Sequence, residues 1–171
     1  MQDSLDCKIL EHLIDKGRIT WAELANILGL SAPAIADRIR RLEEKGVIKG
    51  YTTKVDYKVL GYSLTAFVSV SLSHPKYQEK FLEAVHTFDE IQECYHVLGN
   101  EDYLMKVRCF NTEHLDSFLH GNLKLLPGVT KARTTIVLSP IKELSSVILK
   151  NKKLTKGYIN NTDIKSTKSK S

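Results

Sequence analysis

Two capped helical segments joined by a short glycine turn constrain the fold of this chain more than any other feature of its sequence. Residues 20–23, Thr-Trp-Ala-Glu, form a capping box, in which a threonine hydroxyl and a glutamate carboxylate satisfy free backbone N–H groups at the start of a helix. This helix is expected to end at Gly29, and only Leu30 separates Gly29 from Ser31, the expected cap of the next helix. Helices joined by so short a turn must cross at a steep angle, which is the helix-turn-helix arrangement.

The second of these helices, expected over residues 31–46 with Gly46 closing it, has one apolar face and one face rich in arginine. Ile35, Ile39 and Leu42 recur at spacings of four and three, which places them on one side of a helix. The opposite side and its flank carry Pro33, Asp37, Arg38, Arg40, Arg41 and Glu44. Guanidinium groups bind phosphates or the O6/N7 edge of guanine in a fork, so this face suits the major groove of DNA. The alternative is an ordinary amphipathic helix with a solvated charged side.

We therefore expect this helix to bind double-stranded DNA. The predicted DNA-binding residues are Ser31, Ala32, Pro33, Ala34, Asp37, Arg38, Arg40 and Arg41. The arginines would divide between bases and phosphates, while free backbone N–H groups of the first turn could meet a phosphate. In a dimer, two such helices would reach successive major-groove faces about 34 Å apart, which predicts a palindromic operator.

The net charge of +5 does not by itself support DNA binding, because the excess lies at the C-terminus. Residues 1–50 hold eight basic and eight acidic side chains, whereas residues 142–171 hold eight basic and two acidic ones. The argument for DNA therefore rests on local clustering of arginine and lysine. The tail, residues 150–171, is nearly free of apolar residues and is expected to be disordered; a solubilising role is favoured over a contribution to DNA binding.

Cysteine usage and the lack of long apolar segments favour a cytoplasmic protein that does not contact a membrane. The three cysteines, Cys7, Cys94 and Cys109, are widely spaced and include no CxxC pair. The six histidines do not fall at metal-ligand spacing beside cysteine or carboxylate clusters. We predict no metal site, no cofactor and no catalytic residue.

After residue 61 the apolar pattern changes from the helical period to a period of two. Strands are expected over residues 62–73, 91–98, 103–110 and 129–138, with helices starting at Pro75 and at Thr112, the latter capped by Thr112 itself. This order predicts a ferredoxin-like βαββαβ domain of the α+β class, with both helices on one face of an antiparallel sheet. The uncovered face predicts a homodimer.

These patterns predict four segments. They are a three-helix winged helix-turn-helix domain (1–50), a wing strand and hinge (51–61), the ferredoxin-like oligomerisation domain (62–149), to which the resemblance described below adds effector binding, and the basic tail (150–171). The wing is expected because VIKGYTTKV, residues 47–55, is rich in β-branched and aromatic residues. Residues 141–149 are expected to add an edge strand or a short helix.

Over residues 4–145 the chain resembles the Lrp/AsnC family of feast/famine regulators. Its most specific motif is LSAPAIADRIRRLEEKGVIKGYTTKVD, residues 30–56, which is similar to the family's recognition helix and following strand. VLGNEDYLMKV (97–107) looks like the hairpin before the third strand of the effector domain, and LPGVTKARTTIVL (126–138) looks like its closing segment. The tail beyond residue 149 departs from the family's usual short C-terminus.

The resemblance implies a DNA-binding regulator whose dimers commonly assemble into octamers, with a small effector, often an amino acid, bound between dimers. By this resemblance one wall of the effector site would consist of Gly99, Asn100 and Asp102, and the facing strand would supply Thr135, Ile136 and Val137. Exposed N–H groups of a glycine turn can hold a carboxylate, and an aspartate can hold an ammonium group. The alternative is that the glycine and asparagine only make a hairpin turn and the strand residues belong to the sheet core.

Two other functions remain open from the sequence. One is an architectural, nucleoid-type DNA-binding protein with weak sequence preference and no effector. The other is an Lrp-like tetrapyrrole decarboxylase subunit, which the intact arginine-rich helix argues against. The leading hypothesis is a sequence-specific transcriptional regulator and not an enzyme.

Overall fold

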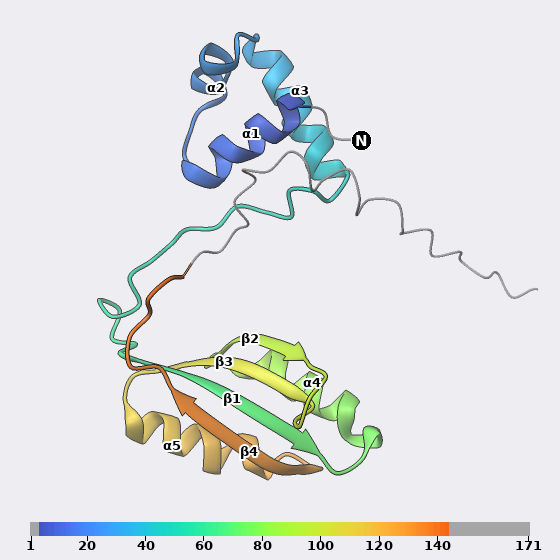
Figure 1. Ribbon diagram of the computed structural model, residues 1–171, viewed down its shortest axis with the longest axis vertical. Coiled ribbons are helices and arrows are strands. Elements are labelled where there is room, and N and C mark those ends of the chain that lie inside the picture. Colours follow the sequence, from blue (N-terminus) through green and yellow to red (C-terminus); the bar gives the residue numbers. More distant parts are fainter. Residues whose placement is uncertain (1–3, 144–171) are drawn as a thin grey trace, which may run out of the picture. The chain divides into compact units, whose positions relative to one another are not determined.

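The computed structural model describes residues 4–143, which divide into two compact units (Figure 1). The first contains the residues up to Lys54, and the second is Val55–Glu143, so the boundary falls within the expected hinge. The predicted tail and residues 144–149 of the predicted last element lie outside the described residues, and residues 141–143 form no helix or strand. No helix of residues 4–143 is both long and apolar enough to cross a membrane.

The first unit contains three helices, α1 (Ser4–Asp15), α2 (Trp21–Leu28) and α3 (Ala32–Glu44). Their apolar faces meet in a small core formed by Ile9, Leu24, Ala25, Ile35 and Ile39. Ala25 is only 5% exposed, and its short side chain lets α2 and α3 approach closely. The three helices of the predicted helix-turn-helix domain are confirmed.

The helix ends follow the sequence pattern closely. At the start of α2 the Thr20 hydroxyl accepts from Glu23 N at 3.2 Å, and the Glu23 carboxylate accepts from Thr20 N at 2.7 Å, so the capping box is confirmed. Ser31 Oγ accepts from Ala34 N at 3.4 Å at the start of α3. Gly46 adopts a φ of 66° and completes a C-terminal cap in which Val47 N donates to Leu42 O.

The strand predicted over residues 47–55 is wrong, because the described chain contains no strand between Glu44 and Leu64. A strand is stabilised by hydrogen bonds to a partner strand, and β-branched composition cannot replace them. The N–H groups of Val47 and Ile48 instead donate back to Leu42 O at 2.9 and 3.1 Å, closing the end of α3.

The second unit has the predicted βαββαβ order. Its elements are β1 (Leu64–Leu72), the 3-10 turn η1 (Pro75–Tyr77), α4 (Gln78–Thr87), β2 (Ile91–His96), β3 (Tyr103–Cys109), α5 (Thr112–Gly121), the 3-10 turn η2 (Leu123–Leu125) and β4 (Val129–Ile136). The strands form one antiparallel sheet in the order β2-β3-β1-β4. The cap of α5 is one residue earlier than expected: Asn111 Oδ1, not Thr112, accepts from His114 N at 2.8 Å.

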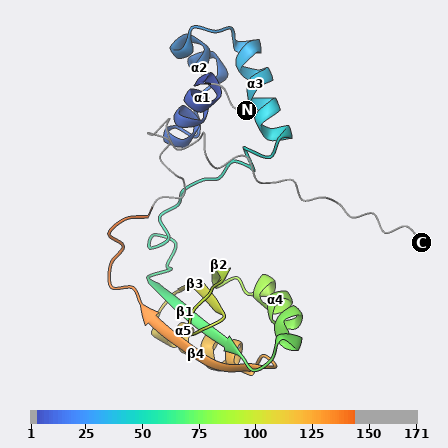
Figure 2. The same cartoon turned by 45° about the vertical axis from the view of Figure 1, so that its right-hand side comes forward.

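Both helices cover the same face of this sheet. In Figure 1, α4 and α5 lie behind and below the strands, and no helix lies in front of them; in Figure 2, α4 lies to the right of the sheet. Alternate residues of β1 and β3 point to the helices and form the core: Leu64, Ala66, Val68, Val70, Tyr103, Met105, Val107 and Cys109. Phe81 and Phe118 pack against them from the two helices.

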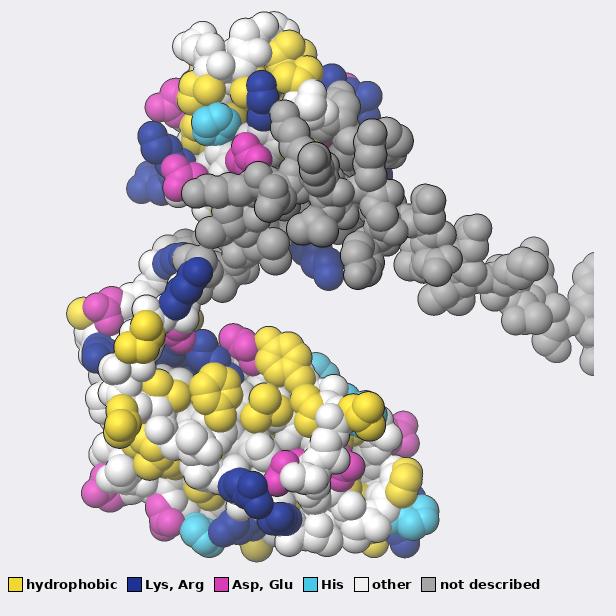
Figure 3. Space-filling model, in the orientation of Figure 1, with side chains coloured by type: hydrophobic (Ala, Val, Ile, Leu, Met, Phe, Trp, Pro, Cys, Tyr) yellow, Lys and Arg dark blue, Asp and Glu magenta, His cyan; other side chains and the backbone are white. Residues whose placement is uncertain are grey.

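The sheet face opposite the helices carries both apolar and charged side chains (Figure 3). Phe67 of β1 and Tyr95 of β2 are exposed at 39% and 53%. Toward one end, Lys106 Nζ and Arg108 Nη2 lie 2.6 and 3.1 Å from the carboxylate of Glu143. Contact with a second apolar surface would remove the exposed rings from water.

Candidate functional sites

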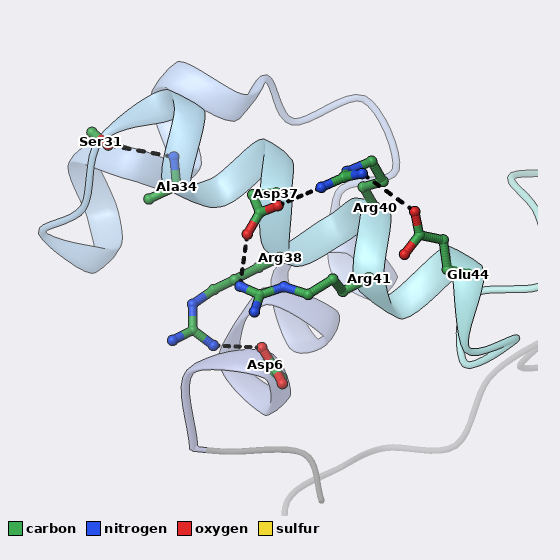
Figure 4. A network of polar contacts seen from close by, with 8 residues as sticks. All are labelled: Asp6, Ser31, Ala34, Asp37, Arg38, Arg40, Arg41 and Glu44. Carbon is green, nitrogen blue, oxygen red and sulfur yellow. Dashed lines mark hydrogen bonds and ion pairs between the residues drawn. The ribbon is translucent and has the colours of Figure 1, made fainter.

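The exposed face of α3 presents two arginines that share one carboxylate (Figure 4). Asp37 Oδ1 lies 2.7 Å from Arg40 Nη2, and Asp37 Oδ2 lies 2.8 Å from Arg41 Nη2. These contacts span three and four residues, the spacings at which side chains meet on a helix. Arg40 and Arg41 keep 65% and 52% of their side-chain surface exposed, so each retains donors that face solvent.

The Asp37 carboxylate is held in its charged form. The hydrogen bond from Arg40 and the positive charge of Arg41 lower the pKa of Asp37 below its ordinary value. The same hydrogen bond and the charge of Glu44 raise the pKa of Arg40. This face therefore carries two guanidinium groups in defined positions, with two carboxylates beside them: Asp37, which both arginines share, and Glu44, which lies 3.4 Å from Arg40.

Arg38 is placed differently from the other two arginines. Its Nη1 donates to Asp6 Oδ1 of α1 at 2.8 Å, and the two side chains are only 24% and 17% exposed. This contact ties α3 to α1, which fixes the direction in which α3 presents its outer face. No local pattern indicated this role, because Asp6 lies 32 residues earlier in the chain.

The first turn of α3 offers fewer free N–H groups than expected. Pro33 has no N–H, and the N–H of Ala34 already donates to Ser31 Oγ. The N–H of Ala32 remains for an incoming phosphate, beside the exposed residues Ser31 and Pro33. The segment can approach a DNA backbone closely, because its side chains are small.

In the second unit, the predicted effector turn lies between β2 and β3. Gly99 and Asn100 are exposed at its tip, and a Cβ added to Gly99 would meet open space. Gly99 does not adopt a positive φ, so the turn does not require glycine for its backbone conformation. Because Gly99 has no side chain, a ligand or a neighbouring subunit could contact the backbone of the turn directly.

Asp102 supports the sheet from the end of this turn. Its Oδ2 accepts from Leu72 N at 2.8 Å, and its own N–H donates to Val70 O at 2.9 Å. One oxygen of the carboxylate that was expected to bind an ammonium group therefore accepts a hydrogen bond from Leu72, the last residue of β1. Its second oxygen is the part available for a ligand.

The other expected wall lies at the opposite end of the sheet. Ile136 pairs with Ala66 near the start of β1, whereas Asp102 bonds to Leu72 at its end. Six residues of extended chain span about 20 Å. Within one chain the turn and Thr135, Ile136 and Val137 therefore do not meet, and only a neighbouring subunit could bring such surfaces together.

Two charged residues beside the turn were not predicted. Arg133 Nη1 lies 3.7 Å from Glu101 Oε1, with side-chain exposures of 61% and 15%. That glutamate oxygen is buried and has no hydrogen-bond partner among residues 4–143. The alternation of β4 would have placed Arg133 on the same face as Thr135, but only the β1–β4 register brings it near the turn.

Comparison with known proteins agrees with this division of the chain. Residues 2–49 match the winged helix-turn-helix DNA-binding family, and residues 65–147 match the Lrp/AsnC ligand binding domain. The leucine-responsive regulatory protein of Escherichia coli (strain K12) is 38% identical over 152 residues, which is 88% of this chain and 93% of that protein.

Solved structures show the same arrangement of elements. A transcriptional regulator from Neisseria meningitidis in complex with L-Met has a TM-score of 0.83 at 28% identity, covering 86% of this chain and 96% of that one. AsnC of E. coli has a TM-score of 0.79 at 29% identity over 84% of this chain and 96% of its own. A feast or famine regulatory protein of M. tuberculosis complexed with L-methionine has a TM-score of 0.79 at 31% identity over 85% of this chain and 98% of its own.

Proposed function

Because this chain belongs to the Lrp/AsnC family of DNA-binding transcriptional regulators, we propose that it reads a palindromic operator with α3 and senses an amino acid through its ligand-binding domain. It is a regulator and not an enzyme, as are the relatives that it matches over most of its length. We place its action in the cytoplasm, with the DNA that it binds.

The proposal that α3 binds DNA rests on one observation, the pair of exposed guanidinium groups that Asp37 holds. In our proposal Arg40 and Arg41 contact bases and phosphates in the major groove. Arg38 orients α3 through Asp6, and the first turn, Ser31 to Ala34, meets the DNA backbone.

A palindromic operator requires two copies of α3 related by two-fold symmetry. The sheet face bearing Phe67 and Tyr95 is the surface that we assign to the homodimer, because its exposed rings would be removed from water there. Dimers would then associate further, up to an octamer, and bring the turn of one subunit to the end of β4 in another.

The DNA-binding proposal is tested with Arg40→Ala combined with Arg41→Ala. Losing two phosphate contacts lowers the affinity for any duplex about 30-fold at 0.15 M salt, and lost base contacts add to this on the operator. The matched control, Lys76→Ala with Lys80→Ala, removes the same charge from exposed positions of the second unit. The measurement is fluorescence anisotropy with a duplex selected by the protein from a random-sequence library.

Unchanged binding by the arginine variant, with the dimer intact, would remove α3 as the recognition surface. The same titration with random DNA at fixed salt separates a regulator from an architectural protein. A regulator prefers its operator by about 10³-fold or more, whereas an architectural protein binds both duplexes nearly equally.

For the effector we propose an amino acid held between two subunits. Gly99, Asn100 and the second oxygen of Asp102 would form one wall, and Thr135, Ile136 and Val137 of a neighbour the other. Glu101 and Arg133 beside the turn supply opposite charges suited to the ammonium and carboxylate groups of an amino acid. Two structural relatives were solved with methionine, which makes methionine and leucine the first candidates.

A thermal-shift screen with each of the twenty amino acids tests this proposal. A ligand at about 100 times its Kd stabilises the folded protein by about 2.7 kcal/mol. Gly99→Val should abolish the shift with little effect on the stability of the free protein, because a Cβ added at this position meets no heavy atom within 4 Å. No ligand-dependent shift, or an undiminished shift in Gly99→Val, would contradict the proposed site.

A further inference from the structure

Trp21, the only tryptophan in the chain, is the first residue of α2 and lies 52% exposed. The capping box on both sides of it fixes its backbone, since Thr20 and Glu23 are bonded to each other through three hydrogen bonds. An indole combines a large apolar surface with one N–H donor, so it suits a partner that is apolar on one side and polar on the other.

The exposed indole borders the arginine-bearing face of α3. It lines a hollow of about 430 Å³ together with Ala36, Asp37, Ile39, Arg40 and Glu43. Two of these residues, Asp37 and Arg40, belong to the face that we assign to DNA. The hollow is therefore continuous with that face and lies on its α2 side.

The acidic residues of the hollow are already bonded within the domain. Asp37 accepts from Arg40 at 2.7 Å, and Glu43 Oε1 accepts from the Tyr51 hydroxyl at 2.8 Å. Arg40 is the cation that lines this hollow; it is 65% exposed, and its Nη2 and Nη1 lie 2.7 and 3.4 Å from Asp37 and Glu44. An anionic partner would meet the donors that Arg40 retains, beside the ring of Trp21.

In helix-turn-helix proteins the second helix enters the major groove while the helix before it crosses the sugar–phosphate backbone. A residue at the junction of α2 and the outer face of α3 then lies against the strand that borders the groove. A deoxyribose presents apolar C–H groups, and the adjoining phosphate presents acceptors.

We propose that Trp21 is a DNA-positioning residue, whose indole packs against a deoxyribose and whose Nε1–H donates to the phosphate next to Arg40. This inference rests on the proposed function, because it requires α3 to lie in the major groove. It assigns to the neutral residue Trp21 the role of fixing the register of α3 along the backbone.

The wild-type protein supplies the first test, since its tryptophan emission comes from Trp21 alone. Adding the duplex selected from the random library should protect the indole from acrylamide quenching and shift its emission. Emission that changes with protein concentration in the absence of DNA would instead place Trp21 at a contact between protein copies, and would overturn the proposal.

Variants of the full chain supply the second test. Trp21→Ala should lower duplex affinity more than about tenfold, because it removes the ring contact together with one hydrogen bond to a charged group, which alone is worth about tenfold. Trp21→Phe should lose less, because it keeps a ring but not the donor. Ile27→Ala is the matched control, since Ile27 is 54% exposed on the same helix and does not line this hollow.

The salt dependence separates Trp21 from the arginines. Removing Arg40 should reduce the slope of log K against log salt by about 0.9, whereas Trp21→Ala should leave it unchanged because no counterion is released at an indole. Suppose that the arginine variants lose binding, that Trp21→Ala binds DNA as tightly as the wild type, and that DNA leaves the tryptophan emission unchanged. This inference then fails and the proposed function stands. If the arginine variants bind normally, the proposed recognition face fails first.

Discussion

Replacing Asp37 with asparagine should strengthen binding to DNA of random sequence. Asp37 holds Arg40 and Arg41 at 2.7 and 2.8 Å, and Glu44 lies 3.4 Å from Arg40, so a phosphate approaching this face meets two cations and two anions, of which Asp37 is shared by both arginines. Asp37→Asn keeps the shape of the side chain and removes the charge. The face then gains one unit of positive charge where the phosphates are expected.

The size of the effect follows from counterion release. Each phosphate that a protein neutralises makes the slope of log K against log salt more negative by about 0.9. One further effective charge on the protein therefore raises its affinity for DNA about fivefold at 0.15 M salt. Specific binding should gain less than this. The carboxylate holds both guanidinium groups in position, and without it more side-chain freedom is lost when the arginines meet the bases.

The assay is anisotropy with a random duplex and with the selected duplex, each at several salt concentrations. We expect tighter random binding, a steeper salt slope and a smaller ratio of specific to random affinity. Glu79→Gln is the control, because it removes the same charge from an exposed position on α4 of the second unit. Random binding that is unchanged or weaker, or equal to that of the control, would refute the placement of Asp37 at the DNA surface.

Three further predictions concern stability. Gly46→Ala should lower the free energy of unfolding by about 1 kcal/mol and lower the Tm of the first unit measured by circular dichroism, because alanine is strained at a φ of 66°. Gly17 does not have a positive φ, so Gly17→Ala should leave the Tm unchanged. Asp102→Ala should lower the free energy of unfolding, measured by chemical denaturation, by about 1 to 3 kcal/mol, because it removes the acceptor of Leu72 N. Asp102→Asn keeps an acceptor and should retain most of the stability; a loss equal to that of the alanine variant would contradict this reasoning. Partial burial of its hydroxyl and the hydrogen bond to Glu43 raise the pKa of Tyr51 to about 12, although the residue is 60% exposed. The contribution of this contact to stability is therefore complete below about pH 10 and is lost as the pH rises through about 12. A difference titration of tyrosine absorbance against Tyr51→Phe should show this late step, and ionisation near pH 10 would exclude the contact.

Much of the fold could be predicted because its signals are local. The capping box at Thr20, the left-handed glycine at Gly46 and the apolar spacing of α3 each depend on residues within about one helical turn. The period of two over residues 62–73 likewise predicted a strand, and β1 shows that alternation in its burial. The failed wing strand shows the limit of such signals, because a strand also needs a partner that composition does not provide.

The candidate sites depended on contacts that no local pattern contains. Sequence spacing treated Arg38, Arg40 and Arg41 as one group, but α1 packs against α3 and supplies Asp6 to the first of them alone. Asp102 was expected to face a ligand, yet one of its oxygens holds the end of β1, 30 residues away in the chain. The β1–β4 register likewise places the two predicted walls of an effector site at opposite ends of the sheet within one chain.

The sequence by itself determined the helices of both units, the four strands of the sheet and the caps of α2 and α3, since these follow from hydrogen bonds and apolar spacing between near neighbours. The tertiary structure decided which charges are partnered, which glycine borders open space and which residues share an end of the sheet. These outcomes depend on packing between segments far apart in the chain, where small differences in helix crossing or strand register change every side-chain contact.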